Sequence, residues 1–139
     1  QLVWTDAAEH KYIEESGTMN IVFQIGDKLI TPDESHDTIL RGITKRSVFE
    51  IAEKWGVTVE ERMVTVAEIV EAARNGTLKD AFGAGTAATI APIAMIGYED
   101  EKFMLPPVEE RLLSNKIKKY LGDLKVGRIA DEFGWNLLV

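Results

Sequence analysis

The sequence predicts an α+β fold, in which helices surround a mixed, mostly antiparallel sheet. Stretches of alternating apolar residues, typical of strands, are interleaved with stretches of helical periodicity. The pair Gly26-Asp27 between two apolar stretches is typical of a hairpin turn, and few segments have the pattern of a parallel crossover. The length of 139 residues, of which 45% are hydrophobic and 28% charged, indicates one globular domain over residues 1–139.

The first predicted elements are strands joined by tight turns. Residues 1–5 are predicted to form a short buried strand, which a polar connection follows. Gly17 suggests a tight bend, after which residues 18–25 alternate as a strand. The Gly26-Asp27 turn then returns the chain as a second hairpin arm over residues 28–30.

The first helix begins near Gly42 and is the most clearly periodic segment of the chain. Gly56 is a typical C-terminal stop for this helix. The residues that fall on its apolar face are Val48, Ile51, Ala52 and Trp55.

Two further helices and four strands are predicted in the second half of the chain. The capping-box pattern Thr65-Val66-Ala67-Glu68 starts one helix, which reaches about residue 74, and an amphipathic helix over about residues 109–124 follows Pro106-Pro107. The strands are predicted over residues 57–64, 78–82, 90–96 and 103–105, with a loop of small residues at 83–89 and a charged turn at 98–102. The apolar tail residues Phe133, Trp135 and 137–139 are predicted to pack onto the core.

The composition argues against several classes of protein. The net charge of -7 does not suit a general nucleic-acid binder, and no apolar run is long enough to span a bilayer. There is no cysteine, and His10 and His36 show no metal-ligand spacing, so we expect no disulfide, thiol switch or metal site. The chain opens with Gln1 rather than methionine, which we interpret as a start inside a larger protein.

Three stretches contain the candidate site residues. In the first, Glu14 and Glu15 precede a buried strand, where a carboxylate is costly unless it has a partner. In the second, Gly42-Ile43-Thr44 opens a helix, whose free N–H groups and positive dipole end suit a phosphate group. In the third, residues 83–89 are small enough to let a ligand touch the backbone.

Each stretch also has a plain structural interpretation. Glu14 and Glu15 can be solvated residues before a turn, and taken alone the stretch favours this interpretation. Most helix starts of the Gly42-Ile43-Thr44 kind are simple caps. A small-residue loop such as 83–89 is more often a flexible connection.

Considered together, the three stretches resemble the branched-chain amino-acid aminotransferases, the pyridoxal-phosphate enzymes of fold type IV. The motifs are Glu15-Ser16-Gly17-Thr18-Met19-Asn20, Leu40-Arg41-Gly42-Ile43-Thr44-Lys45-Arg46 and Phe82-Gly83-Ala84-Gly85-Thr86-Ala87-Ala88. The likeness runs from Trp4 to Trp135, and the Trp55-Gly56 pair favours the branched-chain subgroup. It implies the large domain of that fold, a pseudo-barrel sheet with helices around it, and makes this chain the C-terminal, cofactor-binding portion of a larger enzyme.

The resemblance implies transamination of leucine, isoleucine or valine with 2-oxoglutarate by the full-length parent. The implied partners are a small amino acid and a 2-oxo acid, not nucleic acid or a membrane, and the implied state is a cytoplasmic homodimer or higher homo-oligomer. Other activities of the same fold, D-amino-acid aminotransferase and aminodeoxychorismate lyase, stay open, because much of their difference lies outside this chain. A cofactor-binding module without catalysis is a further alternative.

The implied cofactor is pyridoxal 5'-phosphate, and three residues would contact its ring or lie beside it. The resemblance places Glu15 opposite the pyridine nitrogen, where its charge keeps that nitrogen protonated. Thr18 would lie near this pair, and Leu40 would pack against a face of the ring.

The resemblance assigns the phosphate and the substrate to the other two stretches. Gly42, Ile43 and Thr44 would hold the phosphate through backbone N–H groups and the Thr44 hydroxyl, and Thr86 would reach it from the other side. The Thr86 and Ala87 backbone would receive the substrate carboxylate, because neutral amides bind an anion without adding a competing cation.

Three departures from the family pattern matter. The Schiff-base lysine is expected upstream of Gln1, because Lys11, the only lysine before Glu15, is too close to that motif. We therefore expect the isolated chain to be inactive. Arg41 stands where the family usually has proline, and Ala88 and Ala91 replace a Cys-x-x-Cys pair of some relatives, so we expect no thiol regulation.

Overall fold

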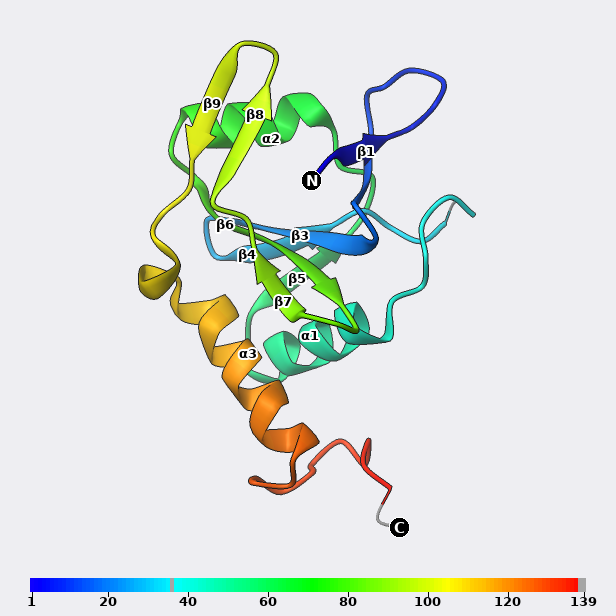
Figure 1. Cartoon of the computed structure of the whole chain (residues 1–139), viewed down its shortest axis with the longest axis vertical. Coiled ribbons are helices and arrows are strands. Elements are labelled where there is room, and N and C mark those ends of the chain that lie inside the picture. Colours follow the sequence, from blue (N-terminus) through cyan, green and yellow to red (C-terminus); the bar gives the residue numbers. More distant parts are fainter. Residues whose placement is uncertain (36, 138–139) are drawn as a thin grey trace.

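A seven-stranded sheet forms the centre of the protein, which we describe from a computed structural model of residues 1–35 and 37–137 (Figure 1). His36, Leu138 and Val139 lie outside the described residues. The strands of the main sheet are β1 (Val3–Thr5), β2 (Ile13–Ser16), β3 (Met19–Ile25), β4 (Lys28–Thr31), β5 (Thr58–Glu61), β6 (Leu78–Gly85) and β7 (Thr89–Pro92). The other elements are the hairpin β8 (Met95–Tyr98) and β9 (Glu101–Met104), the helices α1 (Ile43–Lys54), α2 (Val66–Arg74) and α3 (Leu112–Lys125), and the 3-10 turn η1 (Val108–Glu110).

The strand pairing confirms the predicted α+β class and its mostly antiparallel sheet. Neighbouring strands run antiparallel throughout the described part of the sheet except β4 and β5, which are parallel. Parallel neighbours need a crossover, and here the crossover contains α1. The crossover thereby fixes α1 against the sheet.

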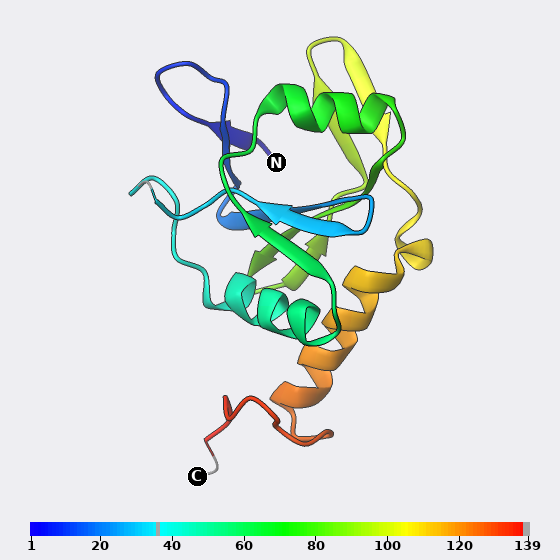
Figure 2. The same cartoon turned by 180° about the vertical axis from the view of Figure 1, so that it is seen from behind.

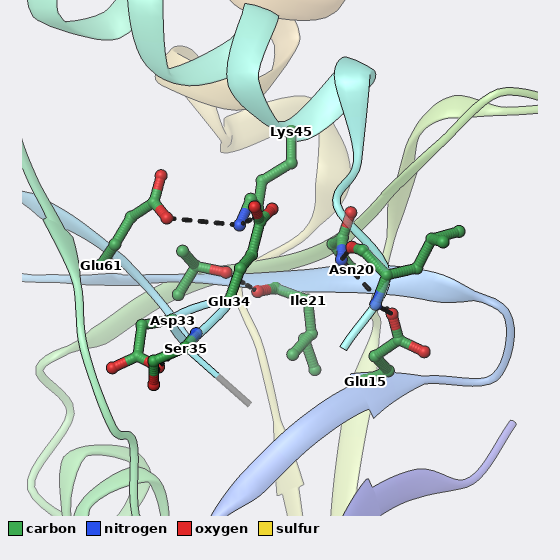
Figure 3. Close-up of polar contacts among 10 residues, drawn as sticks. Glu15, Asn20, Ile21, Asp33, Glu34, Ser35, Lys45 and Glu61 are labelled. Atoms are coloured by element: carbon green, nitrogen blue, oxygen red, sulfur yellow. Dashed lines mark hydrogen bonds and ion pairs between the residues drawn. The ribbon is translucent and has the colours of Figure 1, made fainter. Parts of the chain in front are cut away.

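The central strand β3 has one continuous edge and one divided edge. Its continuous edge pairs with β6, in a register that places Asn20 opposite Ala84. On the other edge, β2 pairs with the start of β3 and β4 pairs with its end. Between the two, the carbonyl of Ile21 accepts a hydrogen bond of 2.6 Å from the Thr31 hydroxyl (Figure 3). The chain leaves β4 at this gap and then returns toward β2.

The core lies on both faces of the sheet, because β3 alternates its side chains. Ile21 and Phe23 belong to the cluster on the α2 face, whereas Val22 packs with α1 and α3 on the other face. Figures 1 and 2 show α2 and the β8–β9 hairpin on one side of the main sheet and α1 with α3 on the other. No helix within the described ranges is long and apolar enough to cross a membrane.

The N-terminal strands differ from the prediction in two ways. β1 was expected to be buried, but Trp4 is 51% exposed, because β1 is an edge strand that pairs only with β2 in the described sheet. The Trp4 indole N–H donates to the Gly17 carbonyl at 3.0 Å. β2 was not predicted, because Ile13–Ser16 shows no alternation of buried and exposed residues, only two half-buried carboxylates between a buried Ile13 and a buried Ser16.

The loop of small residues predicted at 83–89 is shorter than expected. β6 continues through Gly85, so the sequence Gly83-Ala84-Gly85 is strand and not loop. A Cβ atom at Gly83 would lie 2.7 Å from the Met19 Cε, and one at Gly85 would lie 3.0 Å from the Met19 Cγ. The glycines therefore make room for the Met19 side chain on the neighbouring strand, and flexibility is not their role.

The remaining elements agree with the prediction in kind but differ at their ends. The predicted capping box is confirmed, because the Thr65 hydroxyl accepts from the Glu68 N–H at 3.1 Å. The strand predicted over 90–96 is divided into β7 and β8 after Pro92, which has no N–H to donate. The third helix starts at Leu112 and not at 109. In the tail, Phe133 and Trp135 stack at 4.2 Å, but Leu137 is exposed, contrary to the expected packing.

Candidate functional site

The three candidate stretches meet at one end of the main sheet. Antiparallel pairing places the start of β3 beside the end of β6, so the β2–β3 turn and the β6–β7 turn lie at the same end. The start of α1 reaches this end as well, because Gly42 lies against the Asn20 side chain. The close-up in Figure 3 shows Glu15 and Asn20 below the start of α1.

Glu15 is half-buried and held by neutral groups. Its Oε1 atom accepts from the Leu40 N–H at 3.0 Å and from the Asn20 amide at 3.4 Å. Within the described residues, the Oε2 atom accepts no hydrogen bond and no cation contacts the carboxylate. The charge of Glu15 is therefore available to a cationic donor, since one oxygen is oriented and the other is free. Glu14 differs, because its carboxylate accepts from the Thr38 hydroxyl at 2.8 Å.

The first turn of α1 has features that suit an anion. Its N-cap residue is Gly42, no side chain caps the helix, and no acidic residue occupies the first turn. The first N–H groups of a helix have no partner inside it, so they and the positive dipole end are available here. Leu40 is 73% exposed beside this turn, and Ile43 is also exposed.

Gly42 is required by close packing and not by an unusual backbone angle. Its φ of -85° and ψ of 115° are accessible to any residue. A Cβ atom at this position would lie 1.8 Å from the Asn20 Oδ1 atom, which is far inside contact distance. The absence of a side chain lets the helix start come directly onto β3.

The other candidate residues are close to this cluster but not bonded to it. Thr86 and Ala87 are exposed in the β6–β7 turn, and Thr18 is exposed in the β2–β3 turn. Within residues 1–35 and 37–137, no hydrogen bond joins Thr18, Thr86 or Ala87 to Glu15 or to the start of α1. The structure thus brings Glu15, Leu40 and Gly42 together and leaves the two turns open beside them.

The sequence analysis missed a buried lysine at the helix start. Lys45 is fully buried in the first turn of α1, where its Nζ atom lies 2.6 Å from Glu34 and 3.4 Å from Glu61 (Figure 3). These ion pairs link two segments to the helix: Glu34 lies in the chain before α1, and Glu61 ends β5. One signal was present in the sequence, because Lys45 precedes Val48 by three residues on the apolar face.

In the described part of the chain, no group of acidic or histidine side chains could hold a metal ion.

Comparison with known proteins now defines the class. The family model for amino-transferase class IV matches residues 3–96, so the chain belongs to the class IV aminotransferases. It is 39% identical to branched-chain-amino-acid aminotransferase 2 of Bacillus subtilis (strain 168), over 98% of this chain and 37% of that protein. It is 40% identical to a probable branched-chain-amino-acid aminotransferase of Staphylococcus aureus (strain N315), over 100% of this chain and 38% of that protein. The chain thus spans less than two fifths of these curated relatives.

Solved structures support the same fold. A branched-chain aminotransferase of Thermoproteus uzoniensis with norvaline superposes with a TM-score of 0.75 at 26% identity, covering 96% of this chain and 39% of that one. The Escherichia coli branched-chain amino acid aminotransferase gives a TM-score of 0.72 at 23% identity, covering 96% and 40%. The resemblance inferred from the motifs and the predicted fold type are both confirmed.

Proposed function

We propose that this chain is the C-terminal, cofactor-binding domain of a branched-chain amino-acid aminotransferase. The whole protein would transfer the amino group of leucine, isoleucine or valine to 2-oxoglutarate. The observation that supports this most directly is the 3.0 Å hydrogen bond from the Leu40 N–H to Glu15 Oε1, which holds the carboxylate beside a helix start that no side chain caps. Location in the cytoplasm and assembly as a homodimer or higher homo-oligomer stay predictions.

Membership of the class implies pyridoxal 5'-phosphate, and the residues present fit this group. The uncapped N–H groups at Ile43 and Thr44, approached closely because Gly42 has no side chain, suit the phosphate. The Oε2 atom of Glu15, which accepts no hydrogen bond from the described residues, suits the protonated ring nitrogen, and the exposed Leu40 side chain suits one face of the ring. When bound, the cofactor supplies an electron sink for the reaction at the substrate α-carbon.

The remaining candidate residues bind and orient in this proposal. The Thr44 hydroxyl and Thr86 would hold the phosphate, and Thr18 would lie near the ring nitrogen and Glu15. The Thr86 and Ala87 backbone receives the substrate carboxylate, because their turn is exposed at the same end of the sheet. Glu15 would keep the ring nitrogen protonated through its negative charge.

The isolated chain is expected to bind pyridoxal phosphate weakly and to show no transaminase activity. It keeps the proposed phosphate-binding helix start but would lack the lysine that forms the covalent bond with the cofactor. We propose that this lysine lies upstream of Gln1. The measurement is the visible absorbance of a lysine-linked cofactor after mixing, followed by assay with leucine and 2-oxoglutarate. A stable absorbance that disappears on changing Lys11 or Lys45 would contradict the assignment.

The whole protein provides the test of the activity itself. Glutamate formation from leucine should exceed any reaction with D-alanine, which serves as the control substrate. A preference for D-alanine, or lyase activity on aminodeoxychorismate, would assign the parent to one of the other members of the fold.

A further inference from the structure

Asn20 lies where the three candidate stretches converge. It is 5% exposed on β3, and its backbone pairs with Glu15 on one side and with Ala84 on the other. Its side-chain amide donates to the Leu40 carbonyl at 2.8 Å and to Glu15 Oε1 at 3.4 Å. Figure 3 shows the Asn20 side chain between Glu15 and the chain that enters α1.

The carbonyl side of the same amide faces the helix start. The Asn20 Oδ1 atom occupies the space into which a Cβ at Gly42 would project, only 1.8 Å away. One planar amide therefore contacts Glu15 and Leu40 through its N–H groups and Gly42 through its oxygen. A buried side chain with these contacts has little freedom to move, so the groups that it touches keep fixed separations.

Only a side chain with donors on one arm and an oxygen on the other can make all these contacts. Aspartate at this position would have no N–H and would place a second negative charge beside Glu15. An apolar residue of similar size would leave the Leu40 carbonyl without its donor. Glu15 would then keep the hydrogen bond from the Leu40 N–H but lose the one from residue 20 on the neighbouring strand.

We propose that Asn20 is the positioning residue that sets the Glu15 carboxylate relative to the start of α1. It thereby fixes the span between the group that faces the cofactor ring nitrogen and the amides that hold the phosphate. This inference rests on the proposed function, because it assigns the two ends of the span to one pyridoxal phosphate molecule.

The first test is a double-mutant cycle in the full-length protein, read as the affinity of the apoprotein for pyridoxal phosphate. Asn20→Ala should weaken binding about tenfold or more, which corresponds to about 1.4 kcal/mol. Gly42→Ala should weaken binding as well, because its methyl group displaces the Asn20 oxygen. In the double variant the methyl group has room, so the loss should not exceed that of Asn20→Ala alone. Fully additive losses would overturn the proposal.

The second readout follows Glu15 itself and does not depend on activity. Pyridoxal phosphate labelled with nitrogen-15 in the ring reports the protonation of the ring nitrogen by its chemical shift. Asn20→Ala should move this shift toward the unprotonated value. The matched control is Asn115→Ala on α3. It removes an amide that donates to the Val108 carbonyl at 2.6 Å, and it should leave the chemical shift unchanged.

Several outcomes would contradict the proposed positioning role of Asn20. A wild-type shift and affinity in Asn20→Ala, or the same change in Asn115→Ala, would overturn the positioning role. If Asn20→Ala does not fold, Asn20→Ser, which keeps one hydroxyl donor, replaces it, and failure of both to fold would show that the amide serves the fold alone. If the wild-type protein takes up no pyridoxal phosphate, the proposed function fails, and the inference fails with it.

Discussion

Glu15→Gln in the full-length protein should slow the first half-reaction with leucine about a hundredfold to a thousandfold, a range typical for loss of one preorganised electrostatic contact. The substitution keeps an oxygen that can accept from the Leu40 N–H, so the local packing survives. In the proposed site, it would remove the negative charge that keeps the ring nitrogen of the cofactor protonated, and this charge would matter most as the substrate α-proton leaves. Each tenfold loss of rate corresponds to about 1.4 kcal/mol of transition-state stabilisation.

The measurement combines rapid-mixing kinetics with thermal unfolding of the apoprotein. Glu14→Gln is the matched control, because Glu14 is adjacent in β2 but accepts from the Thr38 hydroxyl and not from the helix start. We expect the control to react at the wild-type rate. A wild-type rate for Glu15→Gln would remove Glu15 from the site. A large loss of apoprotein stability would instead assign it a structural role.

The largest expected loss of stability follows from Arg111→Met. Arg111 lies at the start of α3 and pairs with Asp80 on β6 at 2.9 Å, and both side chains are 1% exposed. Arg111 also donates to the Pro106 carbonyl at 2.8 Å. Removing one member of a buried ion pair leaves the other charge without compensation, which typically costs about 3–5 kcal/mol. The midpoint of urea unfolding of the apoprotein should fall accordingly.

The stability of Arg111→Met should depend on pH through the Asp80 carboxylate, which remains without its cationic partner. Burial raises the pKa of Asp80, against the opposing effects of the Ser114 hydroxyl and the Arg111 guanidinium. Without the guanidinium the pKa of Asp80 rises further, so the folded state binds a proton more tightly than the unfolded state. The stability of Arg111→Met should therefore decrease as pH rises through that pKa and recover as pH falls.

Two comparison variants make this expectation specific. Arg74→Met removes an exposed pair with Glu101 and should change stability by less than about 1 kcal/mol. Replacing both buried partners, as Asp80→Leu with Arg111→Met, should recover much of the loss, because no buried charge remains. Equal losses in Arg74→Met and Arg111→Met would mean that burial of the Asp80 pair contributes nothing.

The features that the sequence predicted well are local ones. The α1 helix and the Thr65 capping box depend on residues within one or two turns, and the Gly26-Asp27 hairpin depends on its own turn. β2 was missed because pairing with β3, and not its own alternation, makes it a strand. Gly83 was assigned to a loop because the Met19 side chain that requires a glycine there is distant in sequence.

The same distinction holds at the candidate site. The motifs containing Glu15, Gly42 and Thr86 were recognisable because each is a short pattern with its own chemistry. Asn20 was part of a recognised motif, but its contact with Gly42 depends on how α1 returns to β3. The partner of Asp80 could not be identified either, because nothing near Asp80 in the sequence indicates Arg111.

The divided edge of β3 has a consequence for the order of folding. Pairing with β2 and β4 closes only tight turns, since Ser16 pairs with Met19 and Ile25 with Lys28, whereas pairing with β6 joins Asn20 to distant Ala84. Short loops close faster than long ones, so we expect pulsed hydrogen exchange during refolding to protect the hairpin amides before those of β6. Simultaneous protection would argue against this order. We therefore expect Glu15 to reach its place beside Asn20 early, and the candidate site to be complete only when the longest loop of the sheet has closed.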